Sequence, residues 1–449
     1  MSAPRTTFME KVRQKDVIVA VVGLGYVGLP LAVGFARAGI RVLGIDVQAA
    51  RVADINRGVS HIPDVPCEVL APEAAAGRLR AGTDYALCAE ADAIVICVPT
   101  PFTKMKAPDL SYIQAAATAL APHVARGALV VLQSTTYPGT TEDLVRPILE
   151  AAGGRAGTDF YLAFSPERID PGNKQFSAHN TPKVVGGIDP ASTEAAAALF
   201  GLLVPPEQIH RVSGPAVAEM CKLLENIFRS VNIALVNELT KLCDRMGLDI
   251  WEVIDAAATK PFGFMPFYPG PGVGGHCIPV DPYYLSWKAR EYDFYTKFIE
   301  LAAEVNSSMP FYTVNKLVEG LNRQGKPLLG AKVLLLGVTF KKDIDDPRNS
   351  PALEVLRTLR ARGAEVSYHD PYVPTIPVRG EAHGEPTPGS RLASLPLTES
   401  LLSSQDCVCL AVAHSAFEIP WLLKHSRFLL DATGVTRHFP QGPGPVIRL

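Results

Sequence analysis

One cysteine of this chain stands in a sequence setting that suits covalent chemistry. Residues 270–282 read Gly-Pro-Gly-Val-Gly-Gly-His-Cys-Ile-Pro-Val-Asp-Pro, and the four glycines and three prolines predict an irregular loop that presents Cys277. Small neighbours leave room for a substrate, and a thiolate is a strong nucleophile that forms thioesters with activated carbonyl groups. Asp281 can act on a water molecule or on the thiol proton. A turn around an incidental buried cysteine fits these residues equally well.

A glycine-rich turn near the N-terminus points to a dinucleotide. Gly23, Gly25 and Gly28 form Gly-x-Gly-x-x-Gly at the end of the β-branched run 17–25. The glycines allow a tight turn and the close approach of a pyrophosphate, which binds at the N-terminus of the following helix. Asp46 ends the next apolar run, where its carboxylate can accept hydrogen bonds from ribose hydroxyls and repel a 2′-phosphate. The pattern predicts NAD rather than NADP, with a tight turn that binds no ligand as the alternative.

Three polar residues lie within a strongly apolar helical pattern. Lys222 and Asn226 are four residues apart and therefore share one face, and Arg229 lies almost one turn further on. The apolar residues within 223–228 predict a largely buried helix, whereas a solvated polar stripe is the alternative for such a pair.

Two further charged segments follow apolar runs. Glu167 and Arg168 come shortly after the run 160–164, and the strand ends of an open parallel sheet face its ligand crevice. Phe340-Lys341-Lys342-Asp343 follows the run 333–337, and a basic loop there can bind a diphosphate. Ordinary surface charge is the alternative for both segments.

The composition limits the class of protein. A chain of 449 residues with 47% hydrophobic and 20% charged residues predicts a compact protein of two or three domains. A net charge of −2 offers no dominant basic surface, so we expect no nucleic-acid partner. Since the chain has neither a membrane-spanning apolar run nor the apolar core of a signal peptide, we expect a cytoplasmic protein without a membrane partner. The eight cysteines form no CxxC pair, so we predict no metal site.

Alternating strand and helix patterns organise about the first 200 residues. They predict a doubly wound parallel sheet, because each apolar run suits a strand that is buried on both faces. The expected strands are 17–25, 41–47, 91–101 and 128–135, and the expected helices are 29–39 and 111–127.

The alternating strand and helix pattern of the sequence ends after residue 215. Residues 216–258 show one long helical pattern that breaks near Gly247, and its apolar stripe is typical of a dimer interface; a helical hairpin packed on its own domain is the alternative. From about residue 330 a second, smaller α/β sheet is expected, with a surface excursion at 373–395 that is rich in proline and glycine. Its expected strands are 331–337, 364–371, 406–415 and 427–434, with a helix at 350–363.

Seven motifs, in order and spread over nearly the whole chain, resemble the nucleotide-sugar 6-dehydrogenases of the UDP-glucose dehydrogenase superfamily. They are GLGYVGLP, ICVPTP, QSTTYPGTT, SPERIDPG, EMCKLLENIFRSVNIALVNE, PGPGVGGHCIPVDP and FKKDIDDPRNSP. The resemblance implies an α/β fold in which a long-helix dimerisation core joins two Rossmann-like parallel-sheet domains. The implied domains are an NAD-binding domain at 1–205, a central helical dimerisation domain with the cysteine loop at 206–312, and a UDP-sugar-binding domain at 313–449.

The family resemblance also implies a reaction. Such enzymes oxidise the C6 hydroxyl of a UDP-sugar to a carboxylate with two NAD⁺ in succession, and Cys277 would carry first a thiohemiacetal and then a thioester. Lys222 matches the lysine that stabilises an oxyanion or shuttles a proton, and Asn226 would help to hold that oxyanion or its water.

The remaining catalytic and binding roles also follow from the resemblance. Asp281 matches the carboxylate that pairs with the lysine and water, Glu167 matches a base for thioester hydrolysis, and Thr135 lies where water and nicotinamide are positioned. The implied NAD-binding residues are Gly23, Gly25, Tyr26, Val27, Gly28, Asp46, Arg51, Thr100, Thr135 and Arg348. The implied residues for the UDP-sugar are Glu167, Arg168, Ile169, Lys222, Asn226, Arg229, Gly274, His276, Phe340 and Lys341.

Residues around Cys277 indicate which UDP-sugar the enzyme oxidises. His276 and the residues after Cys277 resemble the branch that oxidises UDP-N-acetyl-D-glucosamine, a source of precursors for surface polysaccharides. Val280 stands where UDP-glucose enzymes carry lysine. Segment 260–270, KPFGFMPFYPG, departs from the pattern of basic residues common in the UDP-N-acetyl-D-mannosamine branch. That branch is the alternative, and other N-acetylated UDP-hexoses follow it. A non-catalytic NAD or nucleotide-sugar sensor and a single-step dehydrogenase are further alternatives; counting two, none or one NADH per sugar separates the three classes. The expected partners are the UDP-sugar and a second copy of the chain, as a homodimer or higher oligomer.

Overall fold

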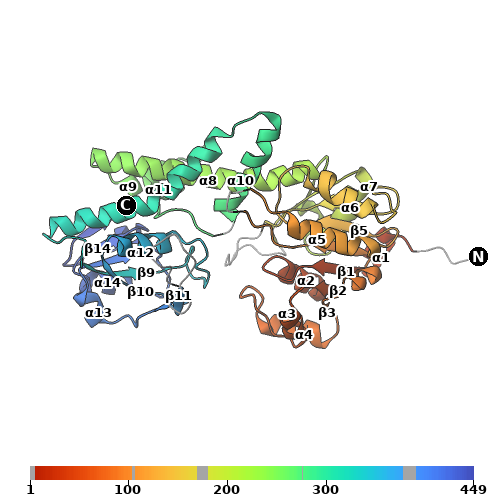
Figure 1. The fold of residues 1–449 in the computed structure, drawn as a ribbon, viewed down its shortest axis with the longest axis horizontal. Helices are drawn as coiled ribbons and strands as arrows, with labels where there is room; N and C mark the ends of the chain where they lie inside the picture. The colour runs from red at the N-terminus through yellow and green to blue at the C-terminus, as the bar shows by residue number, and fades with distance from the viewer. Residues whose placement is uncertain (1–5, 104–106, 169–179, 276, 378–390) are drawn as a thin grey trace, which may run out of the picture. The chain divides into compact units, whose positions relative to one another are not determined.

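The computed structural model describes most of the chain in two compact units, and each is described on its own (Figure 1). The described residues are 6–103, 107–168, 180–275, 277–377 and 391–449. The first unit comprises Met1–Glu225 and Tyr283–Tyr295, and the second comprises Asn226–Pro282 and Thr296–Leu449. Two helices, α8 (Pro215–Met246) and α10 (Cys277–Ala289), contribute residues to both units.

An eight-stranded sheet in the order β3-β2-β1-β4-β5-β6-β7-β8 forms the centre of the first unit. Its strands are β1 (Ile18–Val22), β2 (Arg41–Ile45), β3 (Leu79–Gly82), β4 (Ala93–Ile96), β5 (Leu129–Leu132), β6 (Tyr161–Phe164), β7 (Lys183–Gly187) and β8 (Ile209–Arg211). The pairs from β3 to β6 are parallel, as predicted. The prediction of a wholly parallel sheet is wrong at β6 and β7, which pair antiparallel. An antiparallel neighbour needs no crossover on the face of the sheet, so the chain can return directly from β6.

Helices cover both faces of this sheet, because alternate residues of each strand point to opposite sides. Val19 and Val21 of β1 pack in one core with residues of α2, whereas Ala20 and Val22 pack in another core with residues of α5. This double winding confirms the predicted α/β architecture. The α-helices of the first unit that precede α8 are α1 (Phe8–Gln14), α2 (Gly28–Arg37), α3 (Ala49–Asn56), α4 (Cys67–Ala75), α5 (Ser111–Leu120), α6 (Arg146–Glu150) and α7 (Pro190–Phe200).

Long helices open the second unit. The predicted break at Gly247 is confirmed, since this residue has a φ of 71° and separates α8 from α9 (Ile250–Ala258). The third long helix is α11 (Lys297–Arg323). The prediction that the helix around Lys222 is largely buried is wrong for the single chain, because Leu224 and Phe228 are about half exposed while Leu223 is buried. One face of α8 therefore presents apolar side chains on the surface of the chain.

A second parallel sheet, in the order β10-β9-β13-β14-β15, confirms the predicted smaller α/β domain. Its strands are β9 (Lys332–Leu336), β10 (Glu365–His369), β13 (Cys407–Leu410), β14 (Leu429–Asp431) and β15 (Val446–Arg448). Leu335 packs in one core with α12 (Pro351–Ala361), and Leu334 packs in another with α13 (Glu399–Ser404) and α14 (Ile419–His425). The predicted excursion contains an antiparallel pair, β11 (Thr375–Pro377) and β12 (Arg391–Ala393).

A search of the described helices finds none with both the length and the apolar character that a membrane span requires.

Candidate active site

The glycine turn after β1 has the shape that a dinucleotide needs. Gly23 has a φ of 91°, and a Cβ atom on Gly28 would lie only 1.8 Å from the carbonyl oxygen of Gly23, so both positions require glycine for the turn itself. A Cβ atom on Gly25 would meet nothing within 4 Å. The space in front of Gly25 is therefore open to a ligand, next to Tyr26 and Val27 at the N-terminus of α2. These residues fit a bound pyrophosphate.

The carboxylate of Asp46 is fixed at the end of β2 beside this turn. Its Oδ2 accepts hydrogen bonds from the backbone N–H of Leu24, at 3.0 Å, and from a guanidinium nitrogen of Arg51, at 2.9 Å. Its Oδ1 accepts a hydrogen bond from the N–H of Gln48 at 2.9 Å. Partial burial and the charge of Arg51 lower the pKa of the nearby His61. Asp46 and Arg51, which were each predicted to bind NAD, thus lie together at the turn, and the carboxylate stands where a ribose would be bound.

The other predicted residues of the first unit follow neighbouring strands. Thr100 follows β4, Thr135 follows β5, and Glu167 and Arg168 follow β6. Because β1, β4, β5 and β6 are parallel neighbours in the sheet, their carboxyl ends line one edge, as expected for a ligand crevice. The backbone carbonyl oxygen of Thr100 also accepts a hydrogen bond from the hydroxyl of Tyr284.

Glu167 is held by a buried cation. The ammonium of Lys183 lies 3.0 Å and 3.2 Å from the two carboxylate oxygens of Glu167, and both side chains are almost fully buried. The amide of Gln133 donates a hydrogen bond of 2.7 Å to Oε2, and the backbone N–H of Arg168 donates one of 2.7 Å to Oε1. A buried carboxylate with such partners is stabilised in its ionised form.

The first turns of α8 are tied to the same edge of the sheet. Glu219 accepts hydrogen bonds from the backbone N–H groups of Gly139 and Thr141, at 2.6 and 2.9 Å. Lys222 lies three residues later on the same face of α8, and it is 9% exposed. Arg168 forms an ion pair of 2.7 Å with Glu225, one further turn along. The structure thus brings Lys222, Glu167 and Arg168 to one region of the first unit.

The carboxyl group of Glu219 has a raised pKa. Burial raises its pKa to about 6, while hydrogen bonds from Thr141 and Gly139 oppose the shift and Glu142 adds to it. Thr141 and Glu142 belong to a short π-helical segment, η3 (Thr140–Val145). The carboxylate of Glu219 binds the N-terminus of this segment, where the backbone N–H groups lack partners within the helix.

Cys277 lies in the second unit, and its local structure differs from the prediction. The loop predicted over residues 270–282 ends before the cysteine, which is the first residue of α10. Pro279 falls in the first turn, where backbone N–H groups have no helical partner to lose, whereas Pro282 lies inside the helix. Cys277 is exposed, whereas five of the eight cysteines are buried. For Cys97, burial is the main reason that the pKa of its thiol is raised.

Asp281 and Asn226 form a contact in the second unit that was not predicted from the sequence, since Asp281 was expected to pair with the lysine. Asp281 lies one turn after Cys277 on α10, and only 2% of it is exposed. The amide nitrogen of Asn226 donates a hydrogen bond of 2.6 Å to Oδ2 of Asp281. An amide oriented by a buried carboxylate is well placed to hold a polar ligand or water near the thiol.

A pocket of about 300 Å³ in the second unit contains predicted substrate residues. Phe340 and Lys341 line it together with the aromatic rings of Trp251 and Tyr268. A Cβ atom on Gly274 would lie 2.7 Å from the Cβ of Phe340, so the glycine loop packs closely against the segment after β9. Aromatic walls beside a lysine suit a nucleoside diphosphate, which combines a flat base with negative charge.

Four predicted residues fall outside these clusters. Arg229 is exposed on α8, and Arg348 forms a bidentate ion pair with Asp346 in the second unit. The predicted roles of Arg229 in substrate binding and of Arg348 in NAD binding stay predictions. Ile169 and His276 lie outside the described residues.

Sequence reasoning missed several residues that hold the site in place. Lys183 had a detectable signal, because a lysine within the apolar run of β7 must find a buried partner. Asn237 accepts a hydrogen bond from the N–H of Gly270, and Asn306 supports Asn237 with a bond of 2.9 Å. These two asparagines lie among apolar residues of long helices, and nothing in their spacing predicts that they meet.

The glycine turn and Asp46 at the edge of a parallel sheet define a dinucleotide-binding protein. Three models of one family match the chain in order: the NAD binding domain of the UDP-glucose/GDP-mannose dehydrogenase family at residues 17–204, its central domain at 216–308 and its UDP binding domain at 334–438. The chain therefore belongs to the UDP-glucose/GDP-mannose dehydrogenase family. It is an NAD-dependent UDP-sugar dehydrogenase, and NAD is confirmed as its cofactor.

Individual relatives differ in the sugar that their names specify. The UDP-N-acetyl-D-glucosamine 6-dehydrogenase of Pseudomonas aeruginosa is 37% identical over 90% of this chain and 92% of its own length. The NDP-N-acetyl-D-galactosaminuronic acid dehydrogenase of Ralstonia nicotianae is 38% identical over 93% of this chain and 96% of its own. The solved UDP-D-ManNAc dehydrogenase of Pyrococcus horikoshii has a TM-score of 0.85 and 32% identity, covering 96% of this chain and 98% of its own.

Proposed function

We propose that the chain is a UDP-N-acetyl-D-glucosamine 6-dehydrogenase. It oxidises the C6 hydroxyl of the sugar to a carboxylate by way of a thioester on Cys277. The observation that carries this proposal is the exposed Cys277 at the start of α10, followed one turn later by the buried Asp281, which accepts a hydrogen bond from Asn226 of α8. A one-step alcohol dehydrogenase has no need of such a cysteine.

The first oxidation removes two electrons and two protons from the C6 alcohol: one proton leaves C6 with the electrons as a hydride, and the hydroxyl proton passes to water. NAD⁺ supplies the oxidising power when it is bound, because its nicotinamide accepts these electrons as a hydride. The ammonium of Lys222 stabilises the alkoxide that develops on the sugar oxygen, and Asn226 donates a hydrogen bond to the same oxygen. Burial of Lys222 strengthens this stabilisation, since charges interact more strongly away from water.

Cys277 holds the aldehyde for the second oxidation. Its sulfur forms a C–S bond to the aldehyde carbon, and the aldehyde oxygen takes a proton from Lys222, which recovers it in the second oxidation, to give a thiohemiacetal. Loss of a second hydride and of the hydroxyl proton converts this adduct into a thioester. The position of Cys277 at a helix N-terminus favours the anionic sulfur that attacks, because the backbone dipoles place partial positive charge there.

Water then hydrolyses the thioester. Glu167 acts as the base that takes a proton from this water, and Lys183 and Gln133 hold the carboxylate ready in its ionised form. Asp281 returns to the departing sulfur the proton that it took from the Cys277 thiol before the attack, and Thr135 orients the water. The products are the uronic acid and free Cys277, so two hydrides leave each sugar.

The choice of sugar rests on the chain and on its relatives. UDP-glucose enzymes of this family carry a lysine before the aspartate, whereas this chain has Val280 before Asp281. This difference disfavours UDP-glucose as the substrate. The Pseudomonas aeruginosa relative, at 37% identity, supports UDP-N-acetyl-D-glucosamine. The second candidate is UDP-N-acetyl-D-mannosamine, which the Pyrococcus horikoshii structure favours through its TM-score of 0.85. The presence of both Cys277 and Lys222 favours a catalyst over a non-catalytic sensor.

The proposed protein works as a homodimer assembled through its central domain. Apolar side chains on α8 and in the segment before the glycine loop are exposed, among them Phe228, Leu235 and Met265. They line a groove of about 460 Å³ in the second unit. A second copy would remove this surface from water, which is the usual fate of such patches. The domains that we propose are 1–205, 206–312 and 313–449.

A substrate screen with product counting tests the proposal. UDP-N-acetyl-D-glucosamine, its manno and galacto epimers and UDP-glucose are each supplied with NAD⁺, and NADH and uronic acid are quantified. We expect two NADH per sugar and the highest kcat/KM for UDP-N-acetyl-D-glucosamine. A higher kcat/KM for an epimer would show that this epimer is the substrate instead. One NADH per sugar would overturn the thioester route.

A further inference from the structure

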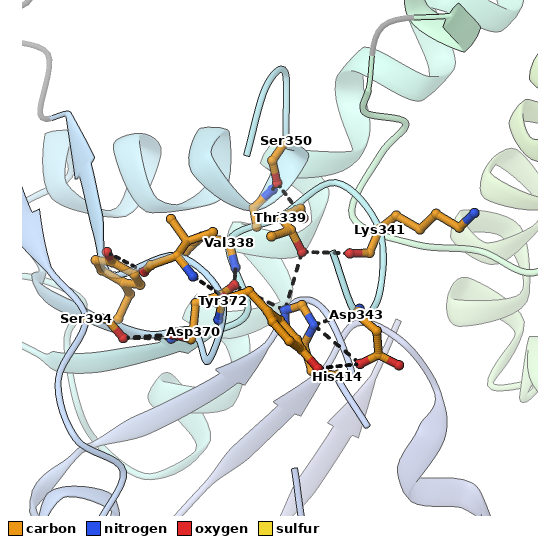
Figure 2. A network of polar contacts seen from close by, with 12 residues as sticks. Val338, Thr339, Lys341, Asp343, Ser350, Asp370, Tyr372, Ser394 and His414 are labelled. Carbon is orange, nitrogen blue, oxygen red and sulfur yellow. Dashed lines mark hydrogen bonds and ion pairs between the residues drawn. The ribbon is translucent and has the colours of Figure 1, made fainter. Parts of the chain in front are cut away.

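A buried histidine joins three loops at the carboxyl end of the second sheet (Figure 2). His414 follows β13, and its side chain has no exposed surface. Its Nδ1 lies 3.0 Å from the backbone nitrogen of Asp343, after β9, and its Nε2 lies 3.1 Å from Oδ2 of Asp370, after β10. The rings of Tyr372 and Phe417 meet the imidazole edge to face, at 5.1 and 5.4 Å. The two hydrogen bonds and the two aromatic contacts together fix the orientation of the imidazole ring.

The partners determine which nitrogen of His414 carries the proton. A backbone N–H can only donate, so Nδ1 must accept the hydrogen bond from Asp343. The proton then lies on Nε2 and is donated to Asp370. Burial alone would raise the pKa of Asp370, but hydrogen bonds from His414 and from the N–H groups of Val338 and Tyr372 outweigh it and lower the pKa. Asp370 therefore stays an acceptor for the imidazole.

The segment between β9 and α12 is fixed at two points. The hydroxyl of Thr339 donates a hydrogen bond of 2.7 Å to the carbonyl oxygen of Lys341. Two residues later, the N–H of Asp343 is bound by His414, and Asp343 has a φ of 60°. The carboxylate of Asp343 also accepts hydrogen bonds from the N–H and hydroxyl of Ser415, at 2.7 and 2.6 Å. A positive φ is uncommon for a non-glycine residue, and these contacts hold the backbone of Asp343 in that conformation.

The fixed segment carries residues that line the pocket of the second unit. Thr339, Phe340, Lys341 and Lys342 all contribute to its wall. Figure 2 shows the side chain of Lys341 extending away from the network around His414. The network thus restrains the backbone of Lys341, whereas the ammonium group of Lys341 points away from the network.

We propose that His414 is a positioning residue for the diphosphate of the substrate. Through its acceptor Nδ1 it holds the Thr339–Asp343 segment in the shape that presents Lys341 to the phosphates. This inference rests on the proposed function and on the role in binding the UDP-sugar that the family resemblance implies for Lys341, which lines the pocket of the second unit. His414 itself touches neither the sugar nor NAD.

Two substitutions separate the acceptor Nδ1 of the imidazole from its Nε2, which lies 3.1 Å from Asp370 and 3.4 Å from the hydroxyl of Thr339. His414→Asn places an amide oxygen near the position of Nδ1 and keeps the acceptor for Asp343. His414→Gln places an amide nitrogen near Nε2 and keeps the donor to Asp370, but loses the acceptor for the loop. Ser394→Ala is a matched control, because Ser394 belongs to the same network but bonds only the backbone of Asp370, at 2.9 and 3.1 Å.

The test measures the Kd of UDP and of NAD⁺ by calorimetry on the full chain, together with kcat and KM. We expect His414→Gln to raise the Kd of UDP and the KM of the sugar nucleotide at least about tenfold. Its Kd for NAD⁺ and its kcat at saturating sugar should stay within about threefold. His414→Asn and Ser394→Ala should keep the Kd of UDP within about threefold, even where they lower the melting temperature.

A double-mutant cycle shows whether His414 acts through Lys341. Once Lys341 is replaced by alanine, adding His414→Gln should weaken UDP binding no further. Should the glutamine variant fail to fold, Thr339→Val removes the hydroxyl that bonds Lys341 and also lies 3.4 Å from His414, and it should raise the Kd of UDP, with Thr339→Ser as its control.

Three results would overturn the inference. Unchanged UDP affinity in His414→Gln and Thr339→Val would show that the loop needs no such support. Equal losses in the glutamine, asparagine and Ser394→Ala variants would show a purely structural role. Failure of the unmodified protein to bind UDP would overturn the proposed function and this inference together, whereas normal UDP binding without sugar oxidation would overturn the proposed function alone.

Discussion

Cys277 and Cys67 offer a direct comparison at the scale of single residues. Both are exposed, and each is the first residue of a helix, α10 and α4 respectively. Helix position alone therefore does not distinguish the proposed nucleophile. What distinguishes Cys277 is its surroundings, with the glycine loop before it and the buried Asp281 one turn after it.

Replacing Cys277 with serine should abolish the complete oxidation. A serine hydroxyl is hardly ionised near neutral pH, so C–S bond formation is lost while the site keeps its size. We expect steady release of uronic acid to fall by about three orders of magnitude or more, while UDP binding stays near normal. Mass spectrometry of the intact protein and of the sugar in a single turnover measures this. Cys67→Ser is the control, and a Cys277→Ser variant that releases uronic acid at the normal rate would contradict the mechanism.

Lys183 should matter both for stability and for thioester hydrolysis. Lys183→Met leaves the buried carboxylate of Glu167 without its cation, and breaking a buried ion pair in this way costs about 3–5 kcal/mol of the free energy of unfolding. Lys183→Met should also slow thioester hydrolysis. Lys183→Arg keeps the charge, so it should reduce the stability and the rate of hydrolysis less than Lys183→Met does. Urea unfolding and the rate of acyl-enzyme hydrolysis after rapid mixing provide the two measurements. Normal hydrolysis in the methionine variant would show that Glu167 does not depend on Lys183.

At the scale of elements, the contact between α8 and η3 depends on one buried carboxylate. Burial raises the pKa of Glu219 from 4.5 to about 6, which means that the folded chain binds this proton more tightly than the unfolded chain does. The contribution of Glu219 to stability is therefore greatest below pH 4.5 and is lost as the pH rises through about 6. A shift of this size corresponds to about 2 kcal/mol.

The variant Glu219→Gln tests this pH dependence. Because glutamine does not titrate, the free energy of unfolding of the unmodified protein, relative to the variant, should fall by about 2 kcal/mol between pH 4 and pH 7. Urea unfolding at several pH values measures the difference. The control Asp143→Asn removes an exposed carboxylate from the same segment and should leave the pH dependence unchanged. A constant difference between the unmodified protein and Glu219→Gln would contradict the assignment.

At the scale of the whole molecule, the proposed dimer predicts the effect of a charge on α8. Leu235 is 54% exposed and lines the apolar groove of the second unit. Leu235→Glu should place a charge in the dimer interface and give a monomer, because a buried unpaired carboxylate is costly. Light scattering at micromolar concentration measures the molecular mass. Leu329→Glu, at a residue that is 75% exposed and outside the groove, should leave the dimer intact. A monomeric unmodified protein would contradict the proposal.

Short-range patterns allowed much of the fold to be predicted from the sequence. The two α/β sheets, the break at Gly247 and the glycine turn follow from residues within a few positions of one another. The local prediction was wrong at Cys277, because glycine and proline content alone does not show that Pro279 falls in a first turn, where a helix accepts it. It was also wrong about the antiparallel strand β7, whose direction depends on how the chain returns to the sheet.

The sequence by itself determined the NAD motif, the family motifs and the alternation of strands and helices, since each depends on local spacing. Only the tertiary structure decided which distant side chains meet. Lys183 reaches Glu167, Asn226 reaches Asp281 across 55 positions, and His414 reaches the loop at Asp343 across 71 positions. The physical reason is that these contacts form where the ends of separate strands and helices converge, and that convergence depends on packing throughout each unit rather than on residues adjacent in sequence.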